Sequence, residues 1–219
     1  MPDPDTVRID LPRPDLPPYL TASPDEPIGC HLIDGILFGT GYAFSAEQLL
    51  TKLDANGGVD TVVVEHADTD HYGALPQVVE RFDPEIVVPD GDHGFLPRTY
   101  ADLTADRLLE DGDHVGDFRA IRVRGHTYGN MCFADEDRDV LVAGDTVVGA
   151  RSDIAGSGRW SGPLADFFNR DTDRARENLV ALADLDVDDV LLTHGEDVDT
   201  GGRDAIERLL GDLGLQWEL

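Results

Sequence analysis

The hydrophobic positions of the first half alternate between short β-branched runs and segments with helical spacing. The runs IGCHLI, ILF and TVVV predict strands, and Asp34-Gly35 between the first two predicts a tight hairpin turn. The segments AEQLLTKL and LPQVVERF space their apolar residues three or four apart, which predicts helices. Ser45 and Gln48 have the spacing of a capping box at the start of the first helix. This half therefore alternates strand, helix and strand.

The second half continues the alternation with a different rhythm. RAIRVRG, NMCFA and DVLVAG predict three consecutive strands joined by short turns. A helical pattern in RARENLVALADL, a strand pattern in DVLLT and a helical pattern in RDAIERLLGDL follow. This order favours an α/β or α+β fold, with mixed sheets covered by helices, over an all-β sandwich or a helical bundle.

The chain of 219 residues has no fixed-period repeat and no long linker, so we expect a single domain over 1–219. Most of its 13 prolines lie in residues 1–26, where we expect an extended, irregular N-terminal segment. We find no secretory signal pattern and no apolar run of the roughly 20 residues that cross a bilayer. A cytoplasmic protein without a membrane partner is expected.

Charge adds a constraint on partners. The chain carries 45 acidic against 17 basic residues, a formal net charge of −28. The acidic residues are spread over the whole length, which is typical of a surface adapted to molar salt, where charges are screened within about 3 Å. No basic cluster is present to bind nucleic acid. Cys30 and Cys132 are too few for a disulfide framework and are expected as small buried thiols.

Residues that bind metals follow four of the predicted strands directly. If these strand ends lie at one edge of the sheets, the side chains can converge on one site. TVVVE leads to His66, Asp68, Asp70 and His71, IRVRG to His126, VLVAG to Asp145, and DVLLT to His194.

Imidazole and carboxylate groups together suit a site for two metal ions. Neutral imidazoles bind borderline divalent ions, and carboxylates neutralise their charge and can bridge them. Two such ions lower the pKa of water so that a hydroxide nucleophile exists at neutral pH, which implies hydrolysis. Each element alone has a simpler reading, as an acidic surface turn around Asp68, a structural His126 or His194, or a turn residue at Asp145. The four together favour a metal site.

The motifs HADTDH, GHTYGN, AGDT and THGE, in this order, resemble the ligand motifs of the metallo-β-lactamase superfamily. The resemblance extends from about residue 27 to the end of the chain. It implies a four-layer αββα sandwich with the site at one edge of its two sheets. It also implies two ligand sets that share one bridging carboxylate. One ion would be held by His66, Asp68 and His126, the other by Asp70, His71 and His194, and both by Asp145.

The chain departs from the family pattern at four positions. Asp68 stands where most members have the second histidine of HxHxDH, and a carboxylate there moves the preference from zinc toward iron or manganese. Gly39, in LFGTG, replaces the aspartate of the usual LIDTG, which supports a metal ligand in relatives, and such losses weaken metal affinity or activity about 10–100-fold. Tyr128 and Asn130 replace the proline and the frequent second histidine of GHTPGH.

Several side chains near the motifs are candidates for contact with a substrate. Tyr72 and Tyr128 flank the predicted ligands, and either hydroxyl could polarise a carbonyl group. Asp70 could also carry a proton to the leaving group. Residues 150–169 combine arginines with aromatics that either orient an anionic or acyl substrate or simply pin a long loop.

The leading hypothesis is a metal-dependent hydrolase in which a metal-bound hydroxide attacks an ester, thioester or lactone of a small molecule. Two divalent ions are expected, with zinc preferred and iron or manganese as alternatives because of Asp68. A di-iron oxidoreductase and a metal-binding scaffold with a degenerate site, suggested by Gly39, are the alternatives. No nucleic-acid or membrane partner is expected, and the oligomeric state stays open. The other histidines, His31, His93 and His114, are expected to have no catalytic role.

Overall fold

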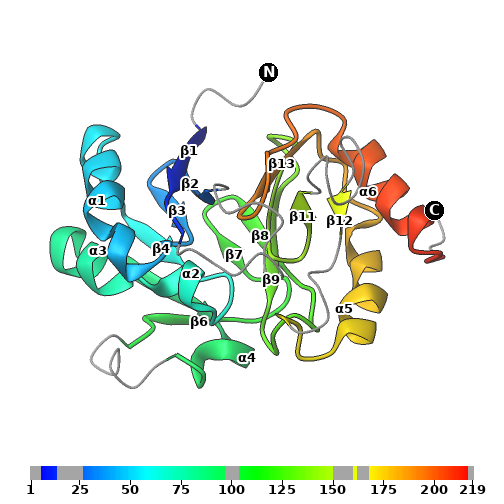
Figure 1. The fold of residues 1–219 in the computed structure, drawn as a ribbon, viewed down its shortest axis with the longest axis horizontal. Coiled ribbons are helices and arrows are strands. Elements are labelled where there is room, and N and C mark those ends of the chain that lie inside the picture. The colour runs from blue at the N-terminus through cyan, green and yellow to red at the C-terminus, as the bar shows by residue number, and fades with distance from the viewer. Residues whose placement is uncertain (1–5, 14–26, 97–103, 150–159, 162–167, 217–219) are drawn as a thin grey trace. The chain divides into compact units, whose positions relative to one another are not determined.

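The computed structural model describes residues 6–13, 27–96, 104–149, 160–161 and 168–216 (Figure 1). These residues form two compact units, one within Pro4–Leu109 and one within Glu110–Leu219, which we call the N-terminal and the C-terminal unit. Each unit contains a mixed β-sheet and the helices that pack on it. None of the described helices combines the length and the apolarity needed to cross a bilayer.

The N-terminal unit has a six-stranded sheet whose strands neighbour one another in chain order. The first three strands are antiparallel neighbours, and the last four are parallel neighbours. The strands are β1 (Thr6–Leu11), β2 (Ile28–Ile33), β3 (Ile36–Phe38), β4 (Thr61–Val63), β5 (Glu85–Pro89) and β6 (Arg107–Leu109).

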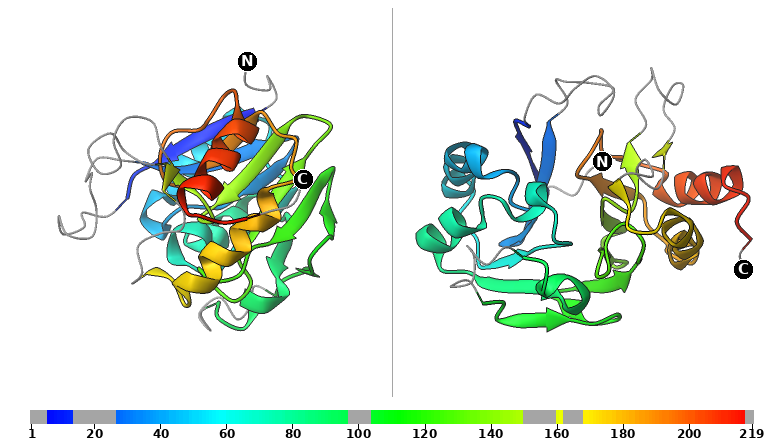
Figure 2. Two further views of the ribbon diagram at one scale, coloured as in Figure 1. Left: turned by 90° about the vertical axis from the view of Figure 1, so that its right-hand side faces the viewer. Right: turned by 60° about the horizontal axis from the view of Figure 1, so that its bottom comes forward.

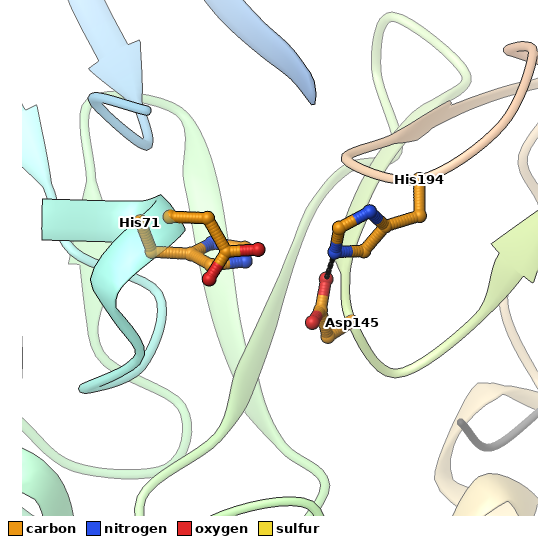
Figure 3. Close-up of side chains that lie close together, drawn as sticks. His71, Asp145 and His194 are labelled. Atoms are coloured by element: carbon orange, nitrogen blue, oxygen red, sulfur yellow. Dashed lines mark ion pairs between the residues drawn. The ribbon is translucent and has the colours of Figure 1, made fainter. Parts of the chain in front are cut away.

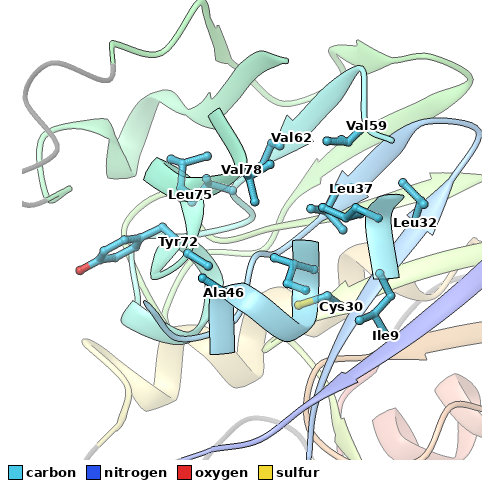
Figure 4. Close-up of a cluster of buried hydrophobic side chains, with 14 of the residues drawn as sticks. Ile9, Cys30, Leu32, Leu37, Ala46, Val59, Val62, Tyr72, Leu75 and Val78 are labelled. Carbon is cyan, nitrogen blue, oxygen red and sulfur yellow. The ribbon is translucent and has the colours of Figure 1, made fainter. Parts of the chain in front are cut away.

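Helices α1 and α3 cover one face of this sheet (Figure 1). The helical elements of the unit are the 3-10 helix η1 (Ala43–Ser45), α1 (Ala46–Ala55), α2 (Thr69–Tyr72), α3 (Leu75–Phe82) and α4 (Asp90–His93). Leu75 of α3 is buried against Leu37 and Val62 of the sheet (Figure 4), and Leu49 of α1 belongs to the same cluster. Each such side chain contributes about 1.5–3 kcal/mol when fully buried, so this cluster fixes the helices to the strands that carry the loops described below.

The C-terminal unit has a five-stranded sheet in the order β13-β10-β9-β8-β7 and a small β11-β12 pair. Its strands are β7 (His114–Val115), β8 (Phe118–Arg122), β9 (Met131–Asp135), β10 (Val140–Gly144), β11 (Val148–Gly149), β12 (Trp160–Ser161) and β13 (Asp189–Leu192). Helices α5 (Thr172–Asn178), α6 (Gly202–Asp212) and the 3-10 helix η4 (Leu179–Leu182) complete it. Leu179 and Ile206 are buried against Leu141 and Leu192, so α6 and η4 pack on one face of the sheet, with α5 beside them (Figure 2).

Parallel pairing brings the carboxyl ends of neighbouring strands to one edge within each unit. In the N-terminal sheet Phe38 pairs with Val63 and Val63 with Val87, so the segments after β3, β4 and β5 leave side by side. In the C-terminal sheet Gly144 pairs with Leu192, so the segments after β10 and β13 do the same. The fold therefore sets candidate ligand loops on strand ends, which are rigid supports.

Most of the predicted elements are confirmed. The hairpin turns through Asp34 and Gly35, whose φ angles of 49° and 78° fit the left-handed turn that Asp-Gly favours. The three strands of the second half are β8, β9 and β10, which are antiparallel neighbours as expected. The predicted helix after residue 174 is α5 continued by η4.

The predicted capping box at Ser45 is wrong. The Ser45 hydroxyl donates instead to the carbonyl of Tyr42, at 2.7 Å, where it closes the preceding 3-10 turn. The Gln48 side chain donates to the backbone carbonyl of Asp10, at 2.9 Å, and so ties α1 to β1. These two hydrogen bonds take the place of those that a capping box would form at the start of α1.

Part of the proline-rich segment is regular. Strand β1 pairs antiparallel with β2 over its whole length, and its Ile9 and Leu11 are buried. The expectation of an irregular leader is therefore wrong over Thr6–Leu11, where apolar and polar residues alternate as in a half-buried strand. Residues 14–26 lie outside the described part of the chain, and the single-domain boundary 1–219 stays a prediction.

Candidate metal centre

Four of the predicted ligands lie in the N-terminal unit, on the segment between β4 and the end of α2. His66 and His71 are fully buried, and their ring centroids lie 3.8 Å apart. Asp68 Oδ2 lies 3.7 Å from His66 Nε2, and its side chain is 39% exposed. Asp70 offers a carboxylate oxygen within 4.8 Å of a ring nitrogen of His71. The segment therefore concentrates imidazole and carboxylate donors as the sequence predicts.

Two neighbouring strand ends hold this segment in place. The amide of Ala67, between His66 and Asp68, donates to Oδ2 of Asp92, at 3.1 Å. The carbonyl of His71 accepts from the amide of Thr40, at 2.8 Å, and from its hydroxyl, at 3.2 Å. Asp92 follows β5 and Thr40 follows β3, so the parallel register of the sheet supplies both supports.

The imidazole of His71 extends from α2 (Figure 3) and has a carboxylate behind it. His71 Nδ1 and Glu65 Oε2 lie 2.9 Å apart, and both side chains are buried. A carboxylate accepts only, so the shared proton belongs on Nδ1 and Nε2 keeps the lone pair that a metal binds. Sequence reasoning missed Glu65, although a carboxylate directly after three valines of a buried strand end was a readable signal.

Negative charge accumulates in this part of the N-terminal unit. Burial raises the pKa of the Cys30 thiol well above its ordinary value, and the charges of Glu65 and Asp70 raise it further. Buried carboxylates are stable when a cation or a set of donors compensates them. The local chemistry therefore fits a bound cation.

The C-terminal unit holds the other three predicted ligands, each directly after a strand or in a strand connection. His126 lies between β8 and β9, Asp145 follows β10, and His194 follows β13. Asp145 Oδ2 lies 3.6 Å from His126 Nε2. Asp145 Oδ1 lies 3.3 Å from His194 Nε2, and Figure 3 shows these two side chains facing each other. The three side chains lie close together, and Asp145 turns a different oxygen toward each imidazole.

His126 is held from behind by an amide. Its Nδ1 lies 3.2 Å from Oδ1 of Asn169, whose own amide nitrogen donates to Thr172 Oγ1, at 3.2 Å. With the amide oriented in this way, Asn169 Oδ1 accepts a hydrogen bond from Nδ1–H of His126. Nε2 then carries no proton, and its lone pair can bind a metal. Nothing in the sequence around Asn169 signals this role, because the two residues are 43 positions apart.

Asn130 joins the His126 loop to the residue after Asp145. Its side-chain amide donates to the carbonyl of Val123, at 3.0 Å, and to the hydroxyl of Thr146, at 2.7 Å. Asn130 stands where relatives often have a histidine, and the structure gives it this bridging role between two ligand-bearing loops.

Gly125, directly before His126, lies against α5. Its φ of +136° is a conformation that side chains rarely adopt, and a Cβ atom there would collide with the backbone nitrogen and Cα of Ala175. The backbone around it is tied to the segment before α5, because the amide of Arg170 donates to the carbonyl of His126, at 3.0 Å, and that of Asp171 to the carbonyl of Gly125, at 2.9 Å. Close packing of α5 therefore fixes the His126 backbone.

The two predicted tyrosines differ in their surroundings. Tyr72 is 5% exposed and belongs to the hydrophobic cluster of the N-terminal unit (Figure 4). This placement gives its ring a packing function, and its catalytic role stays a prediction. Tyr128 is 54% exposed, two residues after His126.

The other predictions have mixed outcomes. His31 is buried in β2, whereas His93, in α4, and His114, in β7, are exposed. Cys30 and Cys132 are buried thiols rather than halves of a disulfide, as expected. The predicted substrate loop lies for the most part outside the described residues, which leave out 150–159 and 162–167.

Comparison with known proteins identifies the family. The model of the metallo-beta-lactamase superfamily matches residues 30–194, well over half of the chain. The chain is 26% identical over 215 residues to the "Probable metallo-hydrolase YflN" of Bacillus subtilis, a match that covers 81% of this chain and 79% of that protein. It is 31% identical over 130 residues to the "Hydroxyacylglutathione hydrolase" of Serratia proteamaculans, covering 57% of this chain but only 46% of that enzyme.

A solved structure confirms the fold. The crystal structure of TTHA1623 in a di-iron-bound form superposes with a TM-score of 0.64 at 23% identity, covering 82% of this chain and 92% of that one. The expected fold class, α/β with two mixed sheets and flanking helices, is thus confirmed. On the strength of its ligand motifs and of these matches, the chain belongs to the metallo-beta-lactamase superfamily.

Proposed function

We propose that the protein is a hydrolase that depends on two divalent metal ions and cleaves an ester, thioester or lactone of a small molecule. The observation that supports this most is the position of Asp145, which turns one oxygen toward His126 and the other toward His194. A carboxylate in that position can bridge two ions, because each oxygen has its own imidazole beside it.

The distances around Asp145 suit shared metal ions better than direct hydrogen bonds. The separations of 3.6 Å and 3.3 Å exceed the usual 2.7–3.2 Å range of N–H···O hydrogen bonds. Two ligands that are each about 2.1 Å from one tetrahedral ion lie about 3.4 Å apart, close to both values. The donor set of this unit therefore fits divalent ions.

The proposed ligands follow the family pattern. One ion would be held by His66, Asp68 and His126, and the other by Asp70, His71 and His194. Asp145 would contact both. We propose zinc, because imidazoles supply four of the seven ligand residues, with iron or manganese as alternatives that the carboxylate of Asp68 would favour.

When bound, two such ions supply the Lewis acidity that lowers the pKa of water and polarises a carbonyl group. The side chains of the protein would position the substrate and protonate the leaving group. Asp70 is proposed to pass a proton to the leaving group, and the exposed hydroxyl of Tyr128 to orient the substrate carbonyl. Glu65 and Asn169 would keep Nε2 of His71 and His126 free of protons.

The substrate class rests on the relatives and on the charge. Proteins named as a probable metallo-hydrolase and as a hydroxyacylglutathione hydrolase match the chain over parts of their length. A net charge of −28 disfavours nucleic acid as a substrate, so we propose a small molecule. The same charge, together with two buried thiols, supports a cytoplasmic, salt-adapted protein without a membrane partner.

A di-iron oxidoreductase is the second candidate. Asp68 brings a carboxylate to 3.7 Å from Nε2 of His66, and a structural relative has a di-iron form. Iron after aerobic purification, with consumption of oxygen or peroxide, would favour this candidate. The third possibility is a scaffold with a degenerate metal site. In that case Asp145→Ala should lose little function, whereas either enzyme would lose its activity.

Turnover of a panel of thioesters, esters and lactones tests the proposal. The protein is assayed in molar salt as purified, after chelation, and after zinc, iron or manganese is added back. We expect hydrolysis of at least one class that disappears with the metal and returns with it. A folded, metal-loaded protein that cleaves no member of the panel would contradict the hydrolase assignment.

A further inference from the structure

We propose that Glu65 is a positioning residue for His71, and that it occupies the space left open by the absence of a side chain at residue 39. The inference rests on the proposed metal centre, because its purpose is to hold His71 with Nε2 directed to an ion. In the family pattern that the motifs resemble, an aspartate stands at the position of Gly39. Here the carboxylate beside His71 belongs to Glu65, the residue before His66.

The first support is the contact itself. Glu65 Oε2 lies 2.9 Å from His71 Nδ1, and the two side chains are only 2% and 1% exposed. Within the described part of the chain, the Glu65 carboxylate meets no Lys or Arg side chain. A buried carboxylate needs a donor, and the imidazole N–H is the one that this carboxylate has.

The second support is the close approach of Glu65 to Gly39. A Cβ atom on Gly39 would lie 3.3 Å from Glu65 Oε2 and 3.7 Å from Cys30 Sγ. The carboxylate therefore lies where a side chain on residue 39 would begin. A carboxylate on residue 39 and the carboxylate of Glu65 would crowd and repel each other, so the two arrangements exclude one another.

The third support is the backbone around Gly39. Its amide donates to the carbonyl of Val63, at 3.0 Å, and the next residue, Thr40, donates to the carbonyl of His71, at 2.8 Å. Residue 39 is thus held within reach of His71, so an aspartate there could serve the same imidazole. Gly39 has φ +72°, and Asp is one of the few residue types that tolerate this region.

The proposal makes the two positions interchangeable, which a double-mutant cycle tests. The variants are Glu65→Ala, Glu65→Gln, Gly39→Asp and the double variant Gly39→Asp/Glu65→Ala. The readout is zinc affinity, measured by competition with a chromogenic chelator. Asp135→Asn is the control, because Asp135 is equally buried but caps the backbone amides of Asp137 and Arg138 in the C-terminal unit.

We expect Glu65→Ala to weaken zinc binding about 10–100-fold, as loss of a carboxylate behind a histidine ligand does. Glu65→Gln, which keeps an acceptor without its charge, should lose less. Gly39→Asp alone should also weaken binding, because it adds a second carboxylate in the same space. The double variant should recover most of the affinity lost in Glu65→Ala, whereas Asp135→Asn should bind zinc like the wild type.

A second readout does not depend on metal. In the metal-free protein, nitrogen-15 NMR of the His71 imidazole should find the proton on Nδ1 in the wild type and lose that preference in Glu65→Ala. A wild-type His71 protonated on Nε2, or unchanged zinc affinity in Glu65→Ala, would overturn the proposal. If the wild type binds no metal but shows the Nδ1 proton, the metal centre fails while the positioning by Glu65 stands.

Discussion

Replacing Gly125 by alanine should destabilise the protein and disturb His126 together. The new Cβ would collide with the backbone nitrogen and Cα of Ala175 and approach its Cβ to 2.6 Å, so α5 or the His126 loop must move. Overpacking of this kind costs about 1–3 kcal/mol. The φ of +136° costs a further ~1–3 kcal/mol for a residue with a side chain.

The two contributions together reach about 2–6 kcal/mol, a large share of the roughly 5–15 kcal/mol that keeps a domain folded. Urea unfolding in molar salt measures the loss. With a slope of about 1–3 kcal/mol per molar urea, the unfolding midpoint should fall by at least about 0.7 M. Zinc affinity should fall as well, because the amides of Arg170 and Asp171 hold the backbone of Gly125 and His126.

Gly211→Ala is the matched control. Gly211 lies in α6, is exposed, and has open space where the Cβ would be. Alanine there should stabilise the protein by about 0.5–1 kcal/mol through helix propensity. Equal unfolding midpoints for Gly125→Ala and the wild type would refute the packing argument.

Three further predictions concern single side chains. Asn169→Ala should weaken zinc binding about tenfold, since His126 loses its Nδ1 partner, and chelator competition measures it. Tyr128→Phe should lower turnover of the best substrate about tenfold or more, and a rate equal to that of the wild type would remove the Tyr128 hydroxyl from the mechanism. Because burial raises the pKa of the Cys30 thiol, that thiol should resist a thiol reagent until urea unfolds the protein, and its contribution to stability should be present at neutral pH and lost as the pH rises above about 8.5. Labelling of the native protein at pH 8 would contradict this.

The positions of the candidate metal ligands could be predicted from the sequence, because each follows a run of apolar residues that is visible locally. His66, His126, Asp145 and His194 each come at or soon after an apolar strand, and strand ends are readable from runs of Val, Leu and Ile. The αβ alternation is readable for the same reason. In each unit, the ligands therefore follow the strands that the sequence predicts.

What the sequence could not supply are contacts between distant residues. The side chain of Gln48 donates to the carbonyl of Asp10 rather than capping its own helix, because β1 passes beside α1. Asn169 reaches His126 across 43 positions, and no local pattern encodes that distance. The position of Glu65 after a buried strand is visible in the sequence. Its close approach to Gly39 is not, because it depends on the register of β3 and β4, which brings the two positions side by side.

The metal content of the purified protein decides whether the chain forms a centre for two metal ions. Protein dialysed in molar salt is analysed for zinc, iron and manganese by plasma mass spectrometry, with Asp145→Ala and Asp135→Asn in parallel. We expect about two ions per chain in the wild type and in Asp135→Asn, and at most one in Asp145→Ala. A wild type free of metal after zinc, iron and manganese have each been offered, or an Asp145→Ala variant that keeps two ions, would contradict it.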